Sequence, residues 1–345
     1  MNSTDPKYTR FALACEMMEV VDIARRFDSG VTKDVAAKIA TVGRLMLTGE
    51  GSSRIFPAKN ARRKALTWGA DVQVATDGSW QSAMYDLAKF AVFAASNSGR
   101  TKEIVLLAKK LLAQGNRHVY GLTANQKTDL QRNTVETFVL GCGKEQAVAA
   151  TKSCVEQGLF YQSIISHIAG RDFSADLAGL DEKLAAALSL PIPPKIVEAA
   201  AGARLVCFAG YNDGVAEELT LKVNEITRKS SDYFEGTYLL HGVEDSLTDR
   251  DVIFVVEPIA EELDKFEQRL VDTVGSKMFT ISTTPMPLPG IVVPDAGAMN
   301  PFVFLAAGWN LLVEVGLALG VDLDKPQLAR KVGNVMDEQA HPPST

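Results

Sequence analysis

A group of polar side chains follows an apolar run at residues 90–95. The stretch 94–103 reads AASNSGRTKE, and its polar candidates are Ser96, Asn97, Ser98 and Thr101. Such side chains, with the backbone N–H groups of a strand-to-helix turn, can donate hydrogen bonds to an anion. Gly99 permits a tight turn. The same residue types also cap helices, so this loop alone leaves anion binding and capping equally open.

A second small-residue turn, GEGSS at 49–53, offers Gly51, Ser52 and Ser53 to the same anion. Its Gly-x-Gly is similar to the start of a dinucleotide-binding fingerprint, but Arg54 stands where the third glycine would be, which argues against NAD. The two loops offer hydroxyls and amides, with no obligatory lysine and no metal-binding carboxylates. They predict a site for a monoester phosphate on a small metabolite, with no cofactor and no metal.

Both loops belong to a chain in which strand-like and helix-like segments alternate. In the first half, strands are expected at 44–48, 72–75, 89–95, 119–123 and 137–141, and helices at 102–114 and 148–168. An amphipathic helix up to about Phe27 precedes them. After the proline-rich segment Ser189–Lys195 the pattern restarts, with strands at 204–209, 252–256, 277–281 and 291–293 and helices at 216–229 and 302–319. This alternation predicts an α/β fold in which helices cover parallel sheets.

The two halves repeat each other weakly. The strand endings at Gly49 and Gly210, and those at Ser96 and Glu257, are about 160 residues apart in both cases. We therefore expect two copies of one α/β unit. Ligands of such sheets bind beyond the carboxyl ends of the strands, which is where both hydroxyl loops lie.

Composition narrows the function classes. The chain has 345 residues, 46% of them hydrophobic, and a net charge of −6, so nucleic acid and an anionic membrane are not expected as main partners. Its four cysteines are scattered, and neither they nor the histidines have the spacing of metal ligands. The first residues lack a signal core, and no stretch approaches the roughly 18–20 apolar residues of a membrane helix. We expect a cytoplasmic protein.

Several motifs resemble the sugar isomerase (SIS) domain family. Ser-x-Ser-Gly-x-Thr at 96–101 looks like its phosphate loop, and Gly51-Ser52-Ser53 is similar to its Gly-Thr-Ser turn. Further segments resemble the isomerase half of glucosamine-6-phosphate synthase, in the same order: EQAVAATKS at 145–153, Lys222-Val-Asn-Glu225, LLHG at 239–242 and DKPQLARK at 324–331. Leu328 comes one place early, but together the motifs span nearly the whole chain.

The resemblance implies two tandem SIS domains, each a parallel sheet flanked by helices in a flavodoxin-like three-layer sandwich. We place an N-terminal helix at 1–30, the phosphate-binding domain at 31–188, a linker at 189–197, the domain with the catalytic Glu and His at 198–322 and a tail at 323–345. Residue 2 is Asn2, so the amino-terminal cysteine of the synthase's glutaminase is not expected here.

Aldose–ketose interconversion needs a base that moves a proton between two adjacent carbons. Glu225 is the candidate, because a carboxylate can serve when partial burial raises its pKa. Lys222 shares its helix face and could position it or stabilise an enediol; an ordinary surface ion pair is the alternative. His241 could open the sugar ring. The other histidines, His118, His167 and His341, are expected to be structural or solvated.

The resemblance adds three further expectations. The histidine would come from a neighbouring subunit, which implies a homodimer with shared active sites. Lys331 would bond covalently to the open ketose. Val148, Ala150 and Thr151 would line the sugar site, although Ala150 stands where the synthase has serine. Arg100 could add charge at the anion or face solvent.

The function we expect is 1,2-isomerisation of an aldose or ketose phosphate, or of an amino-sugar phosphate, through an enediol or enolamine. Deamination or deglycation, which releases ammonia or an amine, is the alternative, because it needs the same anion site and proton transfer. A sulfonate could replace the phosphate. A non-catalytic regulator that binds sugar phosphates is the remaining class, but the combination of Glu225, His241 and Lys331 favours catalysis.

Overall fold

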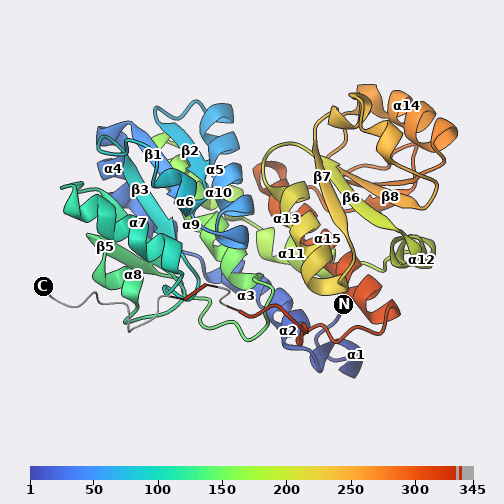
Figure 1. Cartoon of the computed structure of the whole chain (residues 1–345), viewed down its shortest axis with the longest axis horizontal. Coiled ribbons are helices and arrows are strands. Elements are labelled where there is room, and N and C mark those ends of the chain that lie inside the picture. Colours follow the sequence, from blue (N-terminus) through green and yellow to red (C-terminus); the bar gives the residue numbers. More distant parts are fainter. Residues whose placement is uncertain (332–333, 336–345) are drawn as a thin grey trace, which may run out of the picture.

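Five parallel strands form the first sheet, in the order β2-β1-β3-β4-β5. They are β1 (Arg44–Thr48), β2 (Gln73–Asp77), β3 (Ala91–Ala95), β4 (Val119–Thr123) and β5 (Glu136–Val139). The computed structural model describes residues 1–331 and 334–335 (Figure 1). β1 and β4 have their predicted bounds, and the other three differ from the prediction by one or two residues at their ends.

The second sheet repeats this topology. Its strands are β6 (Leu205–Gly210), β7 (Ser231–Glu235), β8 (Asp251–Val256), β9 (Lys277–Ser282) and β10 (Gly290–Val292), in the order β10-β9-β8-β6-β7. Counted along each half, both sheets follow the order 2-1-3-4-5, so the expected repeat of one α/β unit is confirmed. The sequence analysis missed β7, an edge strand with the polar sequence SDYFE, of which Phe234 alone is buried.

Each sheet is the middle of three layers. Met46, Val92 and Ala94 point to a face covered by α7 (Lys102–Ala113), while Leu45 and Phe93 point to the opposite face. On that face lie α4 (Lys33–Val42), α5 (Ile55–Thr67) and α9 (Lys152–Ile168). Successive strand residues point to opposite faces, which explains why these central strands are apolar throughout.

The second sheet is covered in the same way. One face packs on α13 (Val215–Lys222) and α15 (Asn300–Ala318), and the other on α14 (Leu263–Phe266) and the π-helical turn Glu267–Thr273. Three shorter helices complete the first half: α6 (Ser79–Ser82), α8 (Asp129–Arg132) and α10 (Phe173–Leu177). The expected α/β fold of two three-layer domains is confirmed.

The N-terminal segment differs from the prediction of one helix up to Phe27. It forms α1 (Pro6–Thr9), α2 (Ala12–Met18) and α3 (Val20–Arg26). The break before α2 has a physical cause: the carboxylate of Asp324 accepts hydrogen bonds from the N–H groups of Ala12 and Leu13, at 2.7 and 2.9 Å. A distant acidic side chain therefore caps a new helix start.

The proline-rich segment is helical at both ends. α11 (Leu180–Ser189) ends where the linker was expected to begin, and α12 (Pro194–Gly202) starts with a proline, which suits a first helical turn. Between the two helices only residues 190–193 are irregular, and the helices on either side are bent by 68°.

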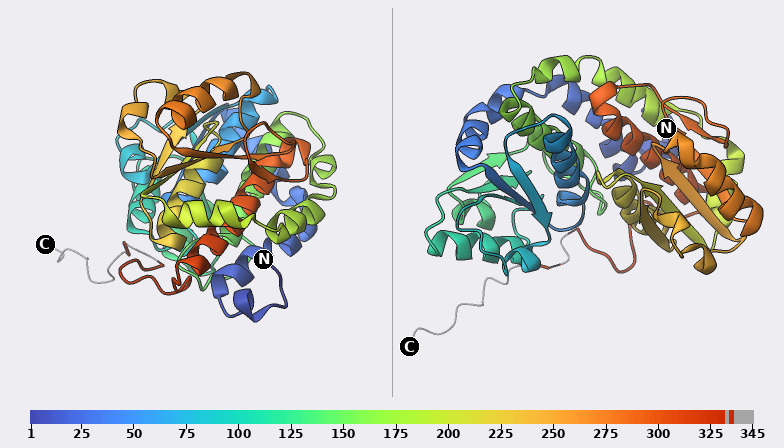
Figure 2. Two further views of the ribbon diagram at one scale, coloured as in Figure 1. Left: turned by 90° about the vertical axis from the view of Figure 1, so that its right-hand side faces the viewer. Right: turned by 90° about the horizontal axis from the view of Figure 1, so that it is seen from above.

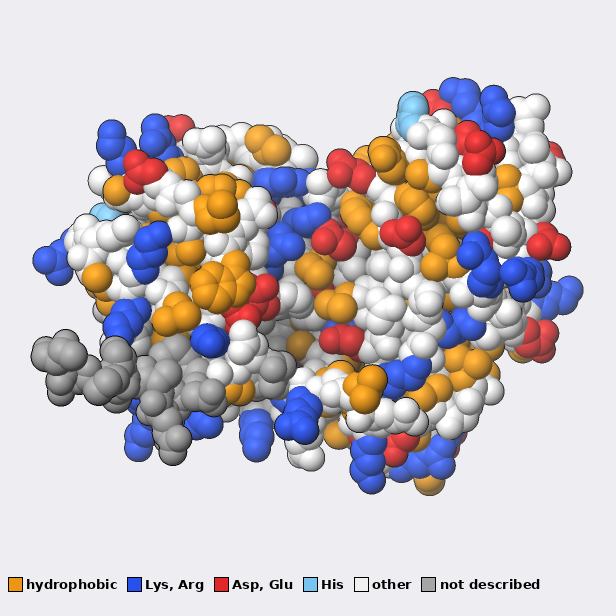
Figure 3. Space-filling model, in the orientation of Figure 1, with side chains coloured by type: hydrophobic (Ala, Val, Ile, Leu, Met, Phe, Trp, Pro, Cys, Tyr) orange, Lys and Arg blue, Asp and Glu red, His pale blue; other side chains and the backbone are white. Residues whose placement is uncertain are grey.

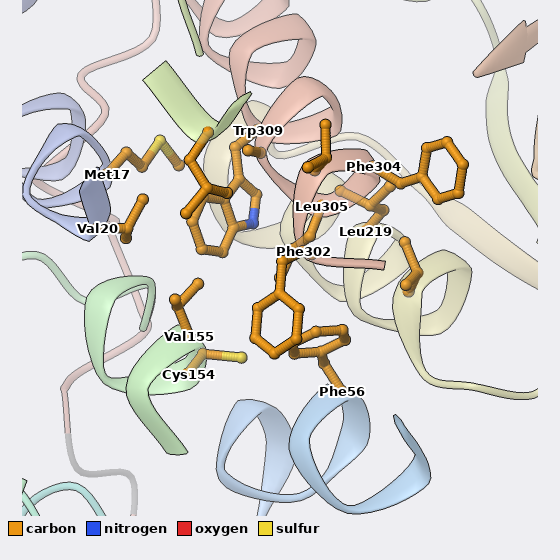
Figure 4. Packing of buried hydrophobic residues seen from close by; sticks show 14 of the residues in the cluster. Met17, Val20, Phe56, Cys154, Val155, Leu219, Phe302, Phe304, Leu305 and Trp309 are labelled. Carbon is orange, nitrogen blue, oxygen red and sulfur yellow. The ribbon is translucent and has the colours of Figure 1, made fainter. Parts of the chain in front are cut away.

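One hydrophobic core runs through both domains. Phe56 of α5 meets Phe302 of α15 edge-to-face, with ring centroids 5.0 Å apart. Around this pair lie Cys154 of α9 and Leu219 of α13 (Figure 4). Aromatic pairs in this geometry stabilise by about 0.5–1.5 kcal/mol beyond the area they bury, so the domains are joined by packing rather than by a flexible tether.

The central helix α15 corrects one composition argument. The helical segment Gly297–Ala318, which includes α15, has a mean hydropathy of 1.6. By length and composition alone, this segment could cross a membrane. The expectation that no stretch approaches this length was wrong. However, 83% of the most apolar window is buried inside the protein, so its apolarity is explained by contact with protein on all sides.

The C-terminal segment returns to the first domain. After α15 in the second domain, the chain crosses below both domains (Figures 1 and 2). There Val335 forms an isolated antiparallel bridge with Thr101, and Lys102 donates a hydrogen bond to the carbonyl of Asn334 at 3.1 Å. This path brings tail residues to the hydroxyl loop.

Candidate active site

The hydroxyl loop is a turn between β3 and α7 that its own side chains brace. The Ser96 and Thr101 hydroxyls are 2.8 Å apart, and Ser96 accepts a hydrogen bond from the N–H of Gly99. Gly99 has a φ of +64°, and a β-carbon there would lie 2.4 Å from Thr128. Glycine is therefore required by conformation and by space. Ser96 is buried within the turn, while Asn97, Ser98 and Thr101 line a pocket.

The turn after β1 lies opposite, in the same pocket. Gly51–Ser53 forms one 3-10 turn before α5, and Gly51 has a φ of +53°. The side-chain amide of Gln157 donates to the carbonyl of Ser53 at 2.5 Å, which ties the turn to α9. The two predicted anion loops are thus held side by side at the carboxyl end of the first sheet, as parallel-sheet topology requires.

The second domain supplies a buried lysine and two carboxylates. Lys222, fully buried at the end of α13, donates to Ser52 Oγ at 2.8 Å and to Glu225 Oε2 at 2.5 Å. Its Nζ also lies 3.1 Å from Glu218 Oε1. Burial alone would lower the pKa of Lys222, but the Glu225 and Glu218 carboxylates outweigh it and raise the pKa above its usual value. The lysine is therefore a cation.

Glu225 lies where the helix widens. Residues Val223–Thr227 form a π-helical turn that ends at Arg228, whose φ is +63°. Single π-turns are frequent at functional sites. The Glu225 side chain stays 26% exposed and lines the pocket. A carboxylate paired on one side and open on the other can exchange a proton with a ligand.

Glu218 is a residue that the sequence analysis missed. Its side chain is fully buried, and burial, which outweighs the attraction of Lys222, raises its pKa. The spacing Glu218, Lys222, Glu225 is i, i+4, i+7, which places all three on one helix face. That spacing in the segment EELTLKVNE was the available signal.

The segment 145–151 is organised by the buried carboxylate of Glu145. It accepts hydrogen bonds from the N–H groups of Thr151 and Ser153 at 2.9 and 3.0 Å, and from Lys331 Nζ at 2.9 Å. Burial would raise the pKa of Glu145, but Lys331 and the N–H donors hold it below its usual value. The prediction of a helix from Val148 was therefore wrong: Glu145 caps α9, which starts at Lys152.

These elements enclose a pocket of about 400 Å³ between the domains. Of the predicted residues it contains Gly51, Ser52, Ser53, Asn97, Ser98, Thr101, Val148, Ala150, Glu225 and Lys331. Thr151 is buried next to it and does not line it, and its hydroxyl has no hydrogen-bond partner among the described residues. The wall also includes Glu50, Glu103, Leu221 and Asn334, which the sequence analysis did not single out.

His241 lies elsewhere in the same chain. It is exposed after the turn Tyr238–Leu240 and lines a separate depression with Lys265 and Arg269. His241 is not among the residues that line the pocket between the domains, where the surface is hollowed (Figure 3). Within one chain, His241 therefore does not meet Glu225.

The remaining histidines and Arg100 do not line the candidate active-site pocket where the structure describes them. A ring nitrogen of His118 is 3.4 Å from the Tyr120 hydroxyl, and that of His167 is 2.9 Å from the carbonyl of Ser29. His341 is outside the described residues. Arg100 is exposed, and its backbone N–H donates to Ser98 Oγ. In residues 1–331 and 334–335, no cluster of three His, Cys, Asp or Glu side chains could hold a metal ion.

Known proteins resemble this chain in sequence and fold. Residues 38–167 match the family model for the SIS domain. A glutamine–fructose-6-phosphate aminotransferase (isomerizing) from Leifsonia xyli is 25% identical over 264 residues, which are 69% of this chain and 43% of that protein. The chain thus spans less than half the length of this curated relative. The sequence resemblance to the SIS family is confirmed.

Two solved structures have the same fold over nearly the full chain. Tagatose-6-phosphate ketose/aldose isomerase from Escherichia coli is 16% identical, with a TM-score of 0.75, and the match covers 98% of this chain and 100% of that one. Glucosamine-6-phosphate deaminase from Thermotoga maritima is 19% identical, with a TM-score of 0.71, over 94% of this chain and 99% of that one.

Proposed function

We propose that this chain, whose residues 38–167 match the SIS domain and which has the fold of a tagatose-6-phosphate ketose/aldose isomerase over nearly its full length, is a phosphosugar aldose–ketose isomerase. The observation that carries the proposal is the position of Glu225. This partly exposed carboxylate, paired with a buried lysine, lies in one pocket with two hydroxyl loops. Phosphosugar isomerases and deaminases among its structural relatives support an enzyme of this kind.

The phosphate binds at the two loops of the first domain. Ser52, Ser53, Ser98 and Thr101 provide hydroxyls there, and backbone N–H groups at the start of α5 and α7 add partial positive charge. A sulfonate has the same tetrahedral arrangement of oxygens and would bind in the same way. The anchored end orients the sugar so that its other end reaches Glu225.

Glu225 moves the proton. The carboxylate removes a proton from C2 of the open aldose, the electron pair forms the C1–C2 double bond, and the C1 carbonyl pair moves onto O1 to give an enediolate. The hydroxyl proton of O2 passes to O1, the C2 carbonyl forms, and the proton on Glu225 returns to C1 to give the ketose. Lys222 stays protonated and stabilises the negative charge that develops on the oxygens. A correctly placed base of this kind contributes about 10²–10⁴-fold to the rate.

We propose a homodimer whose partner provides His241. The ring must open before the proton transfer, and His241 of the same chain lies away from the pocket. Mixing His241→Ala with Glu225→Gln protein tests this: mixed dimers regain one intact site if the site is shared. No recovery after subunit exchange would rule out sharing.

We keep Lys331 as a proposed covalent partner of the open ketose. Its Nζ lines the pocket and is held by Glu145, so a ligand carbonyl could compete for it. Borohydride trapping with fructose 6-phosphate, followed by mass measurement, would show the adduct on the wild type and none on Lys331→Met. A cytoplasmic location is likewise a proposal, consistent with the four free thiols.

The release of an amine is the second candidate. The same proton transfer at C1 and C2 of an amino-sugar phosphate leads to an imine, which water hydrolyses. It is favoured by a second pocket of about 660 Å³, which shares Val148 and Glu225 with the first and leaves room for a substituent on the sugar.

The deciding experiment follows solvent deuterium. Hexose 6-phosphates and amino-hexose 6-phosphates are incubated in D2O, and NMR follows deuterium entry at C1 and C2 while ammonia is measured. We expect exchange that falls by about 10²–10⁴-fold in Glu225→Gln and stays within twofold in Glu257→Gln, a carboxylate outside the pocket. Binding without exchange in the wild type would instead favour a non-catalytic regulator.

A further inference from the structure

Residues 148–150, here called the sugar loop, lie in neither a helix nor a strand. Val148 and Ala150 line the pocket between the domains, whereas Ala149 is buried in the hydrophobic core. Side chains thus alternate between pocket and core, as in an extended segment. Within the part of the chain that the structure describes, the N–H groups of these three residues donate no hydrogen bond to the backbone. The loop is therefore held mainly at its two ends.

The end that leads into α9 is held from within the first domain. The carboxylate of Glu145 accepts hydrogen bonds from the N–H groups of Thr151 and Ser153, directly after the sugar loop. It also accepts one from the side-chain amide of Asn97 at 2.9 Å. Because Asn97 belongs to the hydroxyl loop, this end is tied to the candidate anion site.

The other end is held by a carboxylate from the N-terminal segment. Glu16 of α2 accepts a hydrogen bond on Oε1 from the N–H of Gln146, and one on Oε2 from the N–H of Ala147 at 3.2 Å. α2 lies outside residues 38–167, which match the SIS domain. A helix that precedes the two domains therefore reaches the backbone beside the sugar loop.

The contact at Glu16 requires a carboxylate. Its residue is only 3% exposed, and a buried charge is costly unless it is hydrogen-bonded. Burial raises the pKa of Glu16 and Glu145 adds repulsion, while the two N–H donors and Lys152 oppose both. Each carboxylate oxygen accepts from a different N–H. A glutamine of the same size has one acceptor oxygen and would turn its NH2 group toward the second N–H.

We propose that Glu16 is a positioning residue, which holds the sugar loop at the place where the sugar of the substrate contacts it. Glu16 does not line the pocket; it acts through the N–H groups of Gln146 and Ala147. The inference rests on the proposed function, because it assumes that a sugar occupies the pocket. The phosphate is bound by the hydroxyl loops, and the proton is moved by Glu225 of the second domain. Loss of the Glu16 carboxylate should therefore weaken the binding of the sugar alone.

The test compares two probes on the full chain. Calorimetry measures the binding of inorganic phosphate and of the hexose 6-phosphate that the wild type binds most tightly. In Glu16→Gln, we expect Kd for the hexose phosphate to rise about tenfold or more, the size of one hydrogen bond to a charged group. Kd for inorganic phosphate should stay within about twofold of the wild type. In the deuterium-exchange assay, KM should rise while kcat changes less than about threefold, because the proton-transfer groups stay in place.

Two further variants serve as controls. Glu19→Gln makes the same change three residues later, where the half-exposed carboxylate pairs with Lys152 at 2.7 Å and does not contact the sugar loop. Both Kd values should stay within about twofold of the wild type. Glu16→Asp keeps the charge and both acceptor oxygens but is one carbon shorter, so its Kd for the hexose phosphate should be intermediate. If Glu16→Gln does not fold, Glu16→Asp decides with the same two probes.

Each outcome has a definite meaning. Unchanged hexose phosphate binding, or equal weakening of both probes, overturns the positioning role and leaves Glu16 as a support of the fold. A lower kcat with an unchanged KM overturns it as well. Deuterium exchange by the wild type keeps the isomerase proposal standing in all these cases. If the wild type binds hexose phosphates without exchange, the isomerase proposal fails, and calorimetry still decides on Glu16. If it binds none of them, both proposals fail.

Discussion

The two sheets have the same topology, but the carboxyl end of the first borders an open pocket, whereas that of the second is filled. In the first domain, the loops after β1 and β3 surround an open pocket of about 400 Å³. In the second, the corresponding loops after β6 and β8 surround a space of about 10 Å³, which is roughly one water molecule. A shared fold therefore leaves the function to be decided by the loops.

An arginine from the first domain occupies the carboxyl edge of the second sheet. Arg63 of α5 reaches across from the first domain and binds Asp213 at 2.6 Å and Glu257 at 2.8 Å. Its guanidinium also lies 4.4 Å from the ring centre of Tyr211. The loop positions that hold hydroxyls in the first domain thus hold charged and aromatic side chains that bind the neighbouring domain.

The exchange between the domains is reciprocal. The equivalent helix of the second domain, α13, carries Lys222 to Ser52 of the first. Each domain therefore places a cation at the carboxyl edge of the other. Arg63 fills the carboxyl edge of the second sheet, whereas Lys222 lies beside the carboxyl edge of the first sheet, which stays open. The same kind of contact between domains can therefore hold the domains together at one edge and form part of a reaction site at the other.

The largest effect is expected when each of the two cationic side chains, Lys222 and Arg63, is replaced by a neutral one. Lys222→Met should lower the deuterium-exchange rate by more than about 100-fold, since it removes charge stabilisation in a buried site. Arg63→Met should change that rate less than threefold but lower the free energy of unfolding by about 2–4 kcal/mol, because Asp213 is left buried and unpaired. Exchange NMR and urea unfolding measure the pair. Similar losses of activity in both variants would contradict the division of roles.

A smaller effect is expected where α13 approaches α5. Gly214 has a φ of +92°, and a β-carbon there would lie 2.4 Å from the carbonyl oxygen of Ile55. Gly214→Ala should lower the free energy of unfolding by about 2–3 kcal/mol. Gly236→Ala is the matched control, because its φ is +54° but no atom lies within 4 Å of the added carbon. Urea unfolding should show a cost near 1 kcal/mol for the control; equal costs would mean that the helix contact adds nothing.

The smallest effect concerns Lys64, the neighbour of Arg63. Burial, with Arg63 adding repulsion, lowers its pKa from 10.5 to about 8. Between these values the unfolded chain binds more protons, so stability rises with pH across about 8 to 10.5. Lys64→Met should therefore stabilise the protein at pH 7 by about 1–2 kcal/mol, and this gain should shrink above pH 8. Thermal unfolding at several pH values tests it, and the exposed Lys109→Met should shift stability by less than about 0.5 kcal/mol.

Much of the fold and of the first domain's site could be predicted from the sequence, because both follow from local sequence patterns and from the order of the elements along the chain. The apolar run of β1 and the turn at Ser52 and Ser53 predict one edge, and the spacing of Lys222 and Glu225 predicts a shared helix face. Chain order does not reveal which side chains from other elements complete a wall. Asn334 reaches the pocket only because the tail crosses to α7, where its side-chain amide donates to Glu103.

The errors in predicted element boundaries also arise from contacts that the local sequence pattern does not reveal. The start of α9 was predicted too early because the carboxylate of Glu145, which is outside the apolar pattern, caps the helix at Lys152. β7 escaped detection because an edge strand buries little. His241 has a recognisable motif, yet its distance from Glu225 follows from tertiary arrangement.

The contacts of α2 have a consequence for the order in which the protein matures. Glu16 accepts hydrogen bonds from the N–H groups of Gln146 and Ala147, beside the sugar loop, and the start of α2 is capped by Asp324, 312 residues later than Ala12. During synthesis at about 5–20 residues per second, that partner emerges roughly 15–60 s after Ala12. The support under the sugar loop is therefore completed only near the end of translation, and a ribosome-bound chain that lacks residue 324 should hold no finished site.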